Sequence, residues 1–89
     1  MAHHTDILMG TARVLKERTE QYGSPSETYQ RAAAIASITT GKQMTHYDIA
    51  MTMHAVKLAR MVTGRSNLDH YADAINYLAF AAEFATEEV

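Results

Sequence analysis

The sequence predicts an all-α protein, built as a four-helix bundle, and three observations lead to this fold class. Four segments each begin with residues that commonly cap helix N-termini, close to an acidic residue. No stretch alternates apolar and polar residues with period two, as a half-buried strand does. The single proline and the four glycines stand where a helix starts or stops, or where a helix tolerates them.

The first helix is predicted from its two ends. Thr5 and Asp6 can cap it, and it should run to about Tyr22. Gly23 then ends it in the left-handed conformation that glycine tolerates.

The second helix begins with "SPSE" at 24–27, which predicts a capping box with proline at the first helical position. Ser24 serves as the cap, Glu27 reaches back to it, and the helix should end near Gly41.

Two further segments repeat the signal of a cap followed by an acid three residues later. "THYD" at 45–48 starts a third helix that should end near Gly64. "SNLD" at 66–69 starts a fourth helix, which we expect to run to the C-terminus.

Length limits the chain to one small domain, which we place at residues 5–89. Residues 1–4 are interpreted as a disordered start or a cloning remnant. A core of this size barely offsets the entropy of ordering the chain. We therefore expect the bundle to be completed by association with further copies, as a dimer or a tetramer.

Charge and composition exclude several partners. The net charge of −2 gives no basic footprint for DNA or RNA. No apolar run reaches the length of a membrane span, and no hydrophobic signal core opens the chain. The absence of cysteine excludes disulfides and thiol chemistry. We expect a cytoplasmic protein without nucleic-acid or membrane partners.

The predicted fourth helix carries its polar residues on one narrow stripe. At about 100° per residue, Asp69, Asp73, Asn76 and Glu83 share one side of a helix that is apolar on nearly all others. Such a helix is buried or packed in an oligomer, so the stripe is either its solvated face or a pocket lining. Asp and Asn are poorer helix formers than the residues usual on solvated faces, which argues for the pocket.

The spacing of two acids on this stripe suits a metal ion. Asp69 and Asp73 are four residues apart, and two such carboxylates can jointly hold Mg²⁺ while water and a substrate phosphate complete its oxygen ligands. Asp69 and Asp73 are therefore the candidate metal ligands and catalytic residues, with Mg²⁺ as the candidate cofactor.

Cations on two other helices offer a complement to these acids. Lys57 and Arg60 project from the apolar face of the predicted third helix, and Arg18 sits on the inner face of the first. All three are candidate phosphate-binding residues. Two structural alternatives remain: Lys57 and Arg60 extend their heads into water, or Arg60 pairs directly with Asp73.

The remaining acids are interpreted as structural or surface residues. Glu17 and Glu20, in "ERTE", fall on the side of the first helix opposite its apolar face. Glu27 is already explained by its capping box and by Arg31 four residues later.

Four short motifs, R-x-x-x-Y-G, D-I-A, K-x-x-R and D-x-x-x-D-x-x-x-Y, occur in the chain. They lie in three stretches: "ILMGTARVLKERTEQYGSPSETYQRAAAI", "THYDIAMTMHAVKLAR" and "LDHYADAINYLAFAAEF". In these motifs the chain resembles a family of small, functionally uncharacterised phage and prophage proteins, over about residues 7–84. The matching positions are Arg18, Tyr22, Gly23, Asp48, Lys57, Arg60, Asp69, Asp73 and Tyr77.

The same layout resembles, more distantly, the MazG-type all-α nucleoside triphosphate pyrophosphohydrolases. That likeness implies Mg²⁺, a nucleotide substrate and assembly into dimers or tetramers. Asp73 matches the acidic helix of those enzymes, whereas Asp69 is displaced by one residue. "ERTE" has the spacing of their other acidic pair but lies on the wrong helical face.

Three functional hypotheses follow. In the first, a magnesium-dependent pyrophosphohydrolase acts through Asp69 and Asp73, with phosphates held by the three cations. Tyr22 and Asn76 then contact the base or sugar. In the second, the protein binds a nucleotide or another small phosphorylated ligand without catalysis, as a regulatory or counter-defence factor. In the third, it is a structural interaction module.

Overall fold

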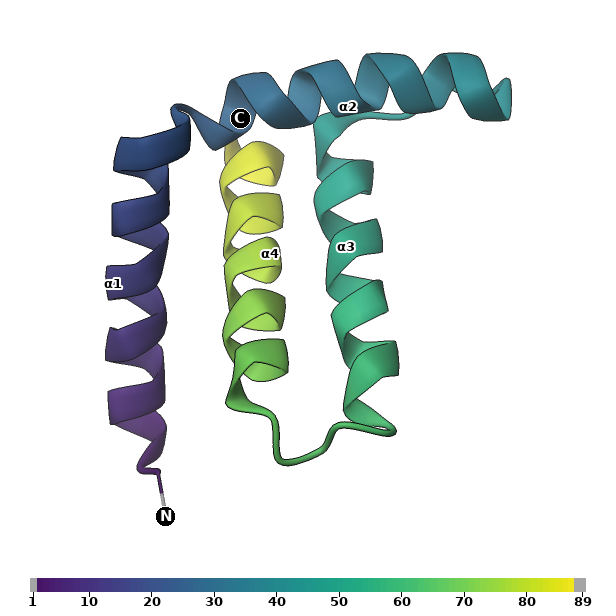
Figure 1. Cartoon of the computed structure of the whole chain (residues 1–89). Helices are drawn as coiled ribbons and strands as arrows, with labels where there is room; N and C mark the ends of the chain where they lie inside the picture. Colours follow the sequence, from purple (N-terminus) through teal and green to yellow (C-terminus); the bar gives the residue numbers. More distant parts are fainter. Residues whose placement is uncertain (1, 88–89) are drawn as a thin grey trace.

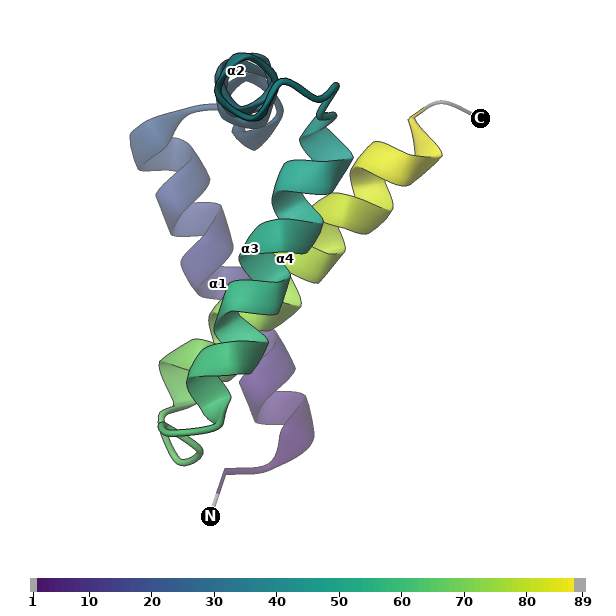
Figure 2. The ribbon, with the colours of Figure 1, turned by 90° about the vertical axis from the view of Figure 1, so that its right-hand side faces the viewer.

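The structure, a computed structural model, describes residues 2–87 and confirms the all-α fold. It contains α1 (His4–Tyr22), α2 (Pro25–Thr40), α3 (His46–Met61) and α4 (Leu68–Thr86), and no residue of 2–87 lies in a strand. Helices α1, α4 and α3 lie side by side, with α4 between the other two, and α2 crosses their ends (Figure 1). The view along α2 shows that crossing directly (Figure 2).

The helix ends agree with the predicted ends to within a few residues, but three predicted N-caps differ. Helix α1 begins at His4, because His3 caps it in place of Thr5 or Asp6: the His3 ring nitrogen Nδ1 accepts a hydrogen bond from the Thr5 backbone N–H at 3.3 Å. Ser24 stands at the N-cap of α2 but its side chain makes no capping hydrogen bond. The predicted capping box therefore does not form there.

The capping box predicted at the start of α3 forms. The Thr45 hydroxyl accepts from the Asp48 backbone N–H at 3.1 Å, and the Asp48 carboxylate accepts from the Thr45 backbone N–H at 2.9 Å. In α4 the cap is Asn67, one residue after the predicted position. Met1, in the predicted N-terminal segment, lies outside the described residues. So do residues 88–89, where the fourth helix was predicted to end.

The hydrophobic core is small and lies where α3 meets the C-terminal half of α4. Ala50, Ala81 and Phe84 are at most 1% exposed. The ring of Tyr29, from α2, packs edge-on against Phe80 and Phe84 at centroid distances of 5.5 and 5.6 Å. This aromatic cluster attaches α2 to the α3–α4 pair.

Two polar contacts fix the register between α3 and α4. His54 lies opposite Ala74, and its Nδ1 donates a hydrogen bond of 2.7 Å to the Ala74 carbonyl oxygen. One turn further along α3, the Lys57 ammonium lies 2.9 Å from the Asp73 carboxylate. These contacts place Asp73, the stripe residue nearest α3, on the side of α4 from which Arg18 of α1 also reaches it.

None of the four described helices combines the length and hydropathy that a membrane crossing requires. The packing is that of a helical bundle, and its completion by further copies remains a prediction.

The two potential caps provide a test of the helix starts. We expect Thr45→Ala to lower the free energy of unfolding by about 1 kcal/mol, because it leaves the Asp48 N–H without its acceptor. Ser24→Ala, at a cap without a side-chain hydrogen bond, should change it by less than about 0.5 kcal/mol. Urea denaturation followed by circular dichroism measures both. Equal losses in the two variants would contradict the difference between the caps.

Candidate functional site

The centre of the site is the carboxylate of Asp73, which two cations contact from opposite helices. Lys57 of α3 lies 2.9 Å from Oδ2, and Arg18 of α1 lies 3.4 Å from Oδ1. The side chains of Lys57 and Asp73 are only 13% and 20% exposed, whereas that of Arg18 is 57% exposed. The Lys57 contact is therefore the tighter and better shielded of the two.

The other predicted charged residues do not join this cluster. Arg60 is exposed and forms no ion pair with any residue of 2–87. The ion pair with Asp73 that was considered for Arg60 is formed by Lys57 instead. Asp69 is also exposed, at the start of α4, where it borders a separate cavity together with Asp6. Glu17 and Glu20 are exposed on α1, as predicted.

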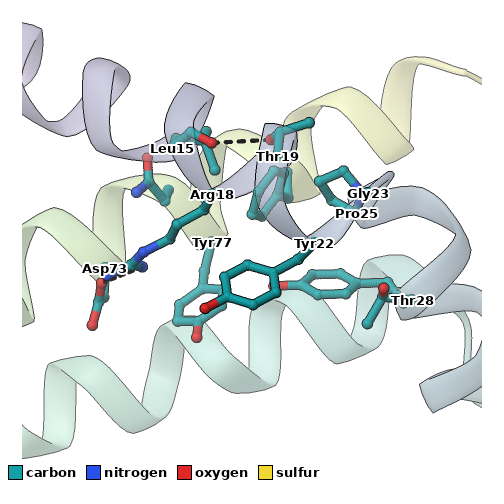
Figure 3. Close-up of a pocket in the computed structure, with 12 residues that line it drawn as sticks. Leu15, Arg18, Thr19, Tyr22, Gly23, Pro25, Thr28, Asp73 and Tyr77 are labelled. Carbon is teal, nitrogen blue, oxygen red and sulfur yellow. Dashed lines mark hydrogen bonds and ion pairs between the residues drawn. The ribbon is translucent and has the colours of Figure 1, made fainter.

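Beside the Asp73 cluster lies a cavity of about 210 Å³, here called the aromatic cavity. The end of α1, the start of α2 and the middle of α4 enclose it, and Arg18 reaches across its edge to Asp73 (Figure 3). Tyr22 and Tyr77 enter it from α1 and α4 (Figure 3). Its lining comprises Leu15, Arg18, Thr19, Tyr22, Gly23, Pro25, Thr28, Tyr29, Asp73, Asn76, Tyr77 and Phe80.

The turn between α1 and α2 gives the cavity its shape. Gly23 has a φ of 84°, a value that residues with a Cβ rarely adopt, and Pro25 starts α2 immediately afterwards. The chain thereby folds back, so that Tyr22 and Tyr29 line the same cavity. The ring of Tyr22 is 80% exposed, which places it at the cavity mouth.

Asn76 is the unusual polar residue of the cavity wall. It is only 6% exposed, and its side-chain amide makes no hydrogen bond with any residue of 2–87. The amide atoms of Asn76 are not among the side-chain atoms that are sealed from solvent without a partner, so they remain accessible at the cavity wall. The amide therefore offers both a donor and an acceptor to whatever occupies the cavity.

Tyr29 keeps its proton in this setting. Burial raises the pKa of its hydroxyl above the ordinary 10.0, and the nearby Tyr77 raises that pKa further. A neutral phenol on the wall can donate a hydrogen bond without adding negative charge.

The metal site predicted from Asp69 and Asp73 does not assemble within one chain. The Asp73 carboxylate is paired with two cations, and Asp69 borders another cavity. Within residues 2–87, no three His, Asp or Glu side chains lie close enough to hold a metal ion together. Because Mg²⁺ prefers several oxygen ligands, the donor set of a single chain does not fit it. Magnesium binding remains a prediction.

The structure thus brings together Arg18, Tyr22, Lys57, Asp73 and Asn76, and leaves Arg60 and Asp69 apart. Sequence reasoning did not identify Tyr29 as a site residue. A signal was present, because a glycine followed by a helix start predicts a sharp reversal. Such a reversal brings the first turns of the second helix toward the end of the first.

Comparison with known proteins places the chain in a family. A model of the domain of unknown function DUF6378 matches residues 6–85, and the chain belongs to that family. No curated protein matches the chain significantly. No solved structure does so either.

The unequal contacts at Asp73 predict unequal stability effects. Lys57→Met should lower the free energy of unfolding by about 2 kcal/mol, because it removes the closer and better buried cation from a shielded carboxylate. Arg18→Met should lower it by less than about 1 kcal/mol, since that contact is long and exposed to water. Urea denaturation at one fixed protein concentration measures both. A larger loss in Arg18→Met would reverse the assignment.

The raised pKa of Tyr29 predicts a loss of stability in alkali. The unfolded chain loses this proton near pH 10.0 while the folded chain retains it, so unfolding becomes more favourable as the pH rises above 10. For Tyr29 the slope should approach about 1.4 kcal/mol per pH unit. Tyr29→Phe keeps the ring contacts and should flatten the decline between pH 10 and 11.

Urea denaturation at several pH values measures that decline. Tyr22→Phe is the matched control, because its ring is 80% exposed, and it should retain the wild-type slope. Identical slopes in Tyr29→Phe and the wild-type protein would refute the role of Tyr29.

Proposed function

We propose that this member of the DUF6378 family binds a small phosphorylated ligand of the nucleotide class in the aromatic cavity, without catalysing its hydrolysis. The observation that carries the proposal is the Asn76 side chain, whose amide makes no hydrogen bond within residues 2–87 and lies in a cavity wall otherwise rich in aromatic rings. A flat heterocycle can stack on such rings and can also satisfy a donor and an acceptor at its edge.

The charges beside the cavity favour an anion. Lys57 and Arg18 face a single carboxylate, so the cluster carries one net positive charge. Arg18 is the less tightly held of the two cations, because it is exposed and its contact with Asp73, at 3.4 Å, is longer than the 2.9 Å contact of Lys57. Arg18 can therefore turn to a phosphate while Asp73 keeps a cationic partner.

The volume of the cavity limits which part of the ligand enters. About 210 Å³ is below the roughly 300 Å³ at which pockets for drug-sized molecules begin. One ring system fits inside, and the phosphate lies at the rim, where Arg18 is accessible. Tyr22, at the mouth, can cover the part that remains outside.

The resemblance to MazG-type pyrophosphohydrolases supports a nucleotide as the ligand class, and the resemblance to small phage and prophage proteins supports a phage setting. A regulatory or counter-defence role in a phage setting belongs to the same proposal. Magnesium-dependent hydrolysis is less well supported, because it needs free carboxylates, and Asp73 is paired with two cations.

Titration calorimetry with nucleoside monophosphates and triphosphates, the parent nucleosides and inorganic phosphate tests the proposal. We expect at least one nucleotide to bind. Its nucleoside and free phosphate should each bind with an affinity at least about tenfold lower. Arg18→Met should weaken nucleotide binding by about tenfold through the lost phosphate contact. Asn76→Leu should weaken the nucleoside and the nucleotide alike, because it removes the edge contact to the base.

Arg13→Met is the matched control, since Arg13 is exposed on α1 and does not line the aromatic cavity. Its affinity should equal that of the wild-type protein. Absence of binding across the panel, or unchanged affinity in both cavity variants, would refute the proposal. Pyrophosphate release that requires magnesium and is abolished by Asp73→Asn would establish the hydrolase in its place.

A further inference from the structure

The chain exposes more surface than a compact monomer of its size. A folded monomer of 9.9 kDa should expose about 5,200 Å², whereas this chain exposes 6556 Å². The excess of about 1,300 Å² is larger than the roughly 800 Å² that each partner contributes to a standard protein interface. The radius of gyration, 14.1 Å, likewise exceeds the value of about 12 Å expected for 89 residues.

Part of the exposed apolar surface lies in one stripe along α3 and its C-cap and in one stripe on α4. Leu58, Val62 and Leu78 are 49%, 83% and 47% exposed. Residues of each stripe recur at spacings of three and four, which places them on one side of their helix. The two stripes together, here called the α3–α4 face, comprise Met51, Ala55, Leu58, Val62, Tyr71, Ile75, Leu78, Ala82 and Ala85. Met51, Tyr71 and Ile75 are half-buried, and the other six are exposed.

Helix geometry places both stripes on the same side of the pair. His54 and Ala74 face each other, and the next residue of each helix, Ala55 or Ile75, is turned about 100° further around its axis. Because the two right-handed helices run antiparallel, this rotation leads to the same side in both. The residue before Ala74 is Asp73, which turns to the opposite side, where Lys57 meets it.

We propose that two copies of this chain pair through the α3–α4 face. None of its nine residues is charged, so two identical faces can meet without like-charge repulsion, as a two-fold symmetric contact requires. Its three alanines allow helices of the two copies to approach closely. The pairing would create an interface of four helices, two from each copy, and would cover the exposed apolar residues of the α3–α4 face.

The aromatic cavity lies on the other side of α4, where Asp73 and Tyr77 point. Pairing therefore leaves the cavity accessible, and this inference does not depend on the proposed ligand.

Sedimentation velocity at protein concentrations from about 1 to 100 μM, which span a micromolar Kd, tests the pairing. The wild-type chain should reach twice 9.9 kDa. Leu58→Arg and Leu78→Arg should each sediment as monomers with wild-type helix content, because a charge is then buried against its own copy. Ile38→Arg, on α2 and 85% exposed, is the control and should remain dimeric.

Thiol labelling gives a second readout of the pairing, and it does not depend on the stability of the arginine variants. The chain has no cysteine, so Ala82→Cys and Ile38→Cys each introduce a single reactive group. Labelling of Ala82→Cys should be several-fold slower at high protein concentration than at low concentration, and labelling of Ile38→Cys should not change. A monomeric wild-type chain, dimers that survive both arginine variants, or equal labelling at both positions would overturn the pairing.

Discussion

The pairing of one carboxylate with two cations organises this small protein. Asp73 sits on the central helix α4, and the side chains of Lys57 and Arg18 reach it from α3 and α1. A single partly buried acid thus connects three of the four helices. The aromatic cluster around Tyr29 attaches the fourth. Because a shielded carboxylate is costly without a partner, these contacts also determine which way the polar stripe of α4 faces.

The sequence predicted the elements well, because most helix ends depend on residues adjacent in the chain. The Thr45 and Asp48 pair and the glycine at position 23 are local signals, and the structure contains helix boundaries at both. Ser24 shows the limit of such signals, since a residue of the right type at the right position makes no capping bond. Spacing alone does not fix the side-chain rotamer.

Sequence reasoning located the site only in part, because the site depends on how the helices rotate against one another. Lys57 and Arg60 lie about 60° apart around α3, so both were reasonable partners for Asp73. Packing of His54 against Ala74 turns Lys57, and not Arg60, toward that carboxylate. Tyr29 enters the cavity from α2, a helix whose crossing angle no local pattern encodes.

The hydrogen bond between His54 and Ala74 also determines the tautomer of that histidine. A carbonyl oxygen can only accept, so Nδ1 must carry the hydrogen at every pH at which the bond exists. The lone pair of the neutral ring is consequently at Nε2. That nitrogen is therefore the position at which the ring can accept a hydrogen bond while the link between the two helices stays in place.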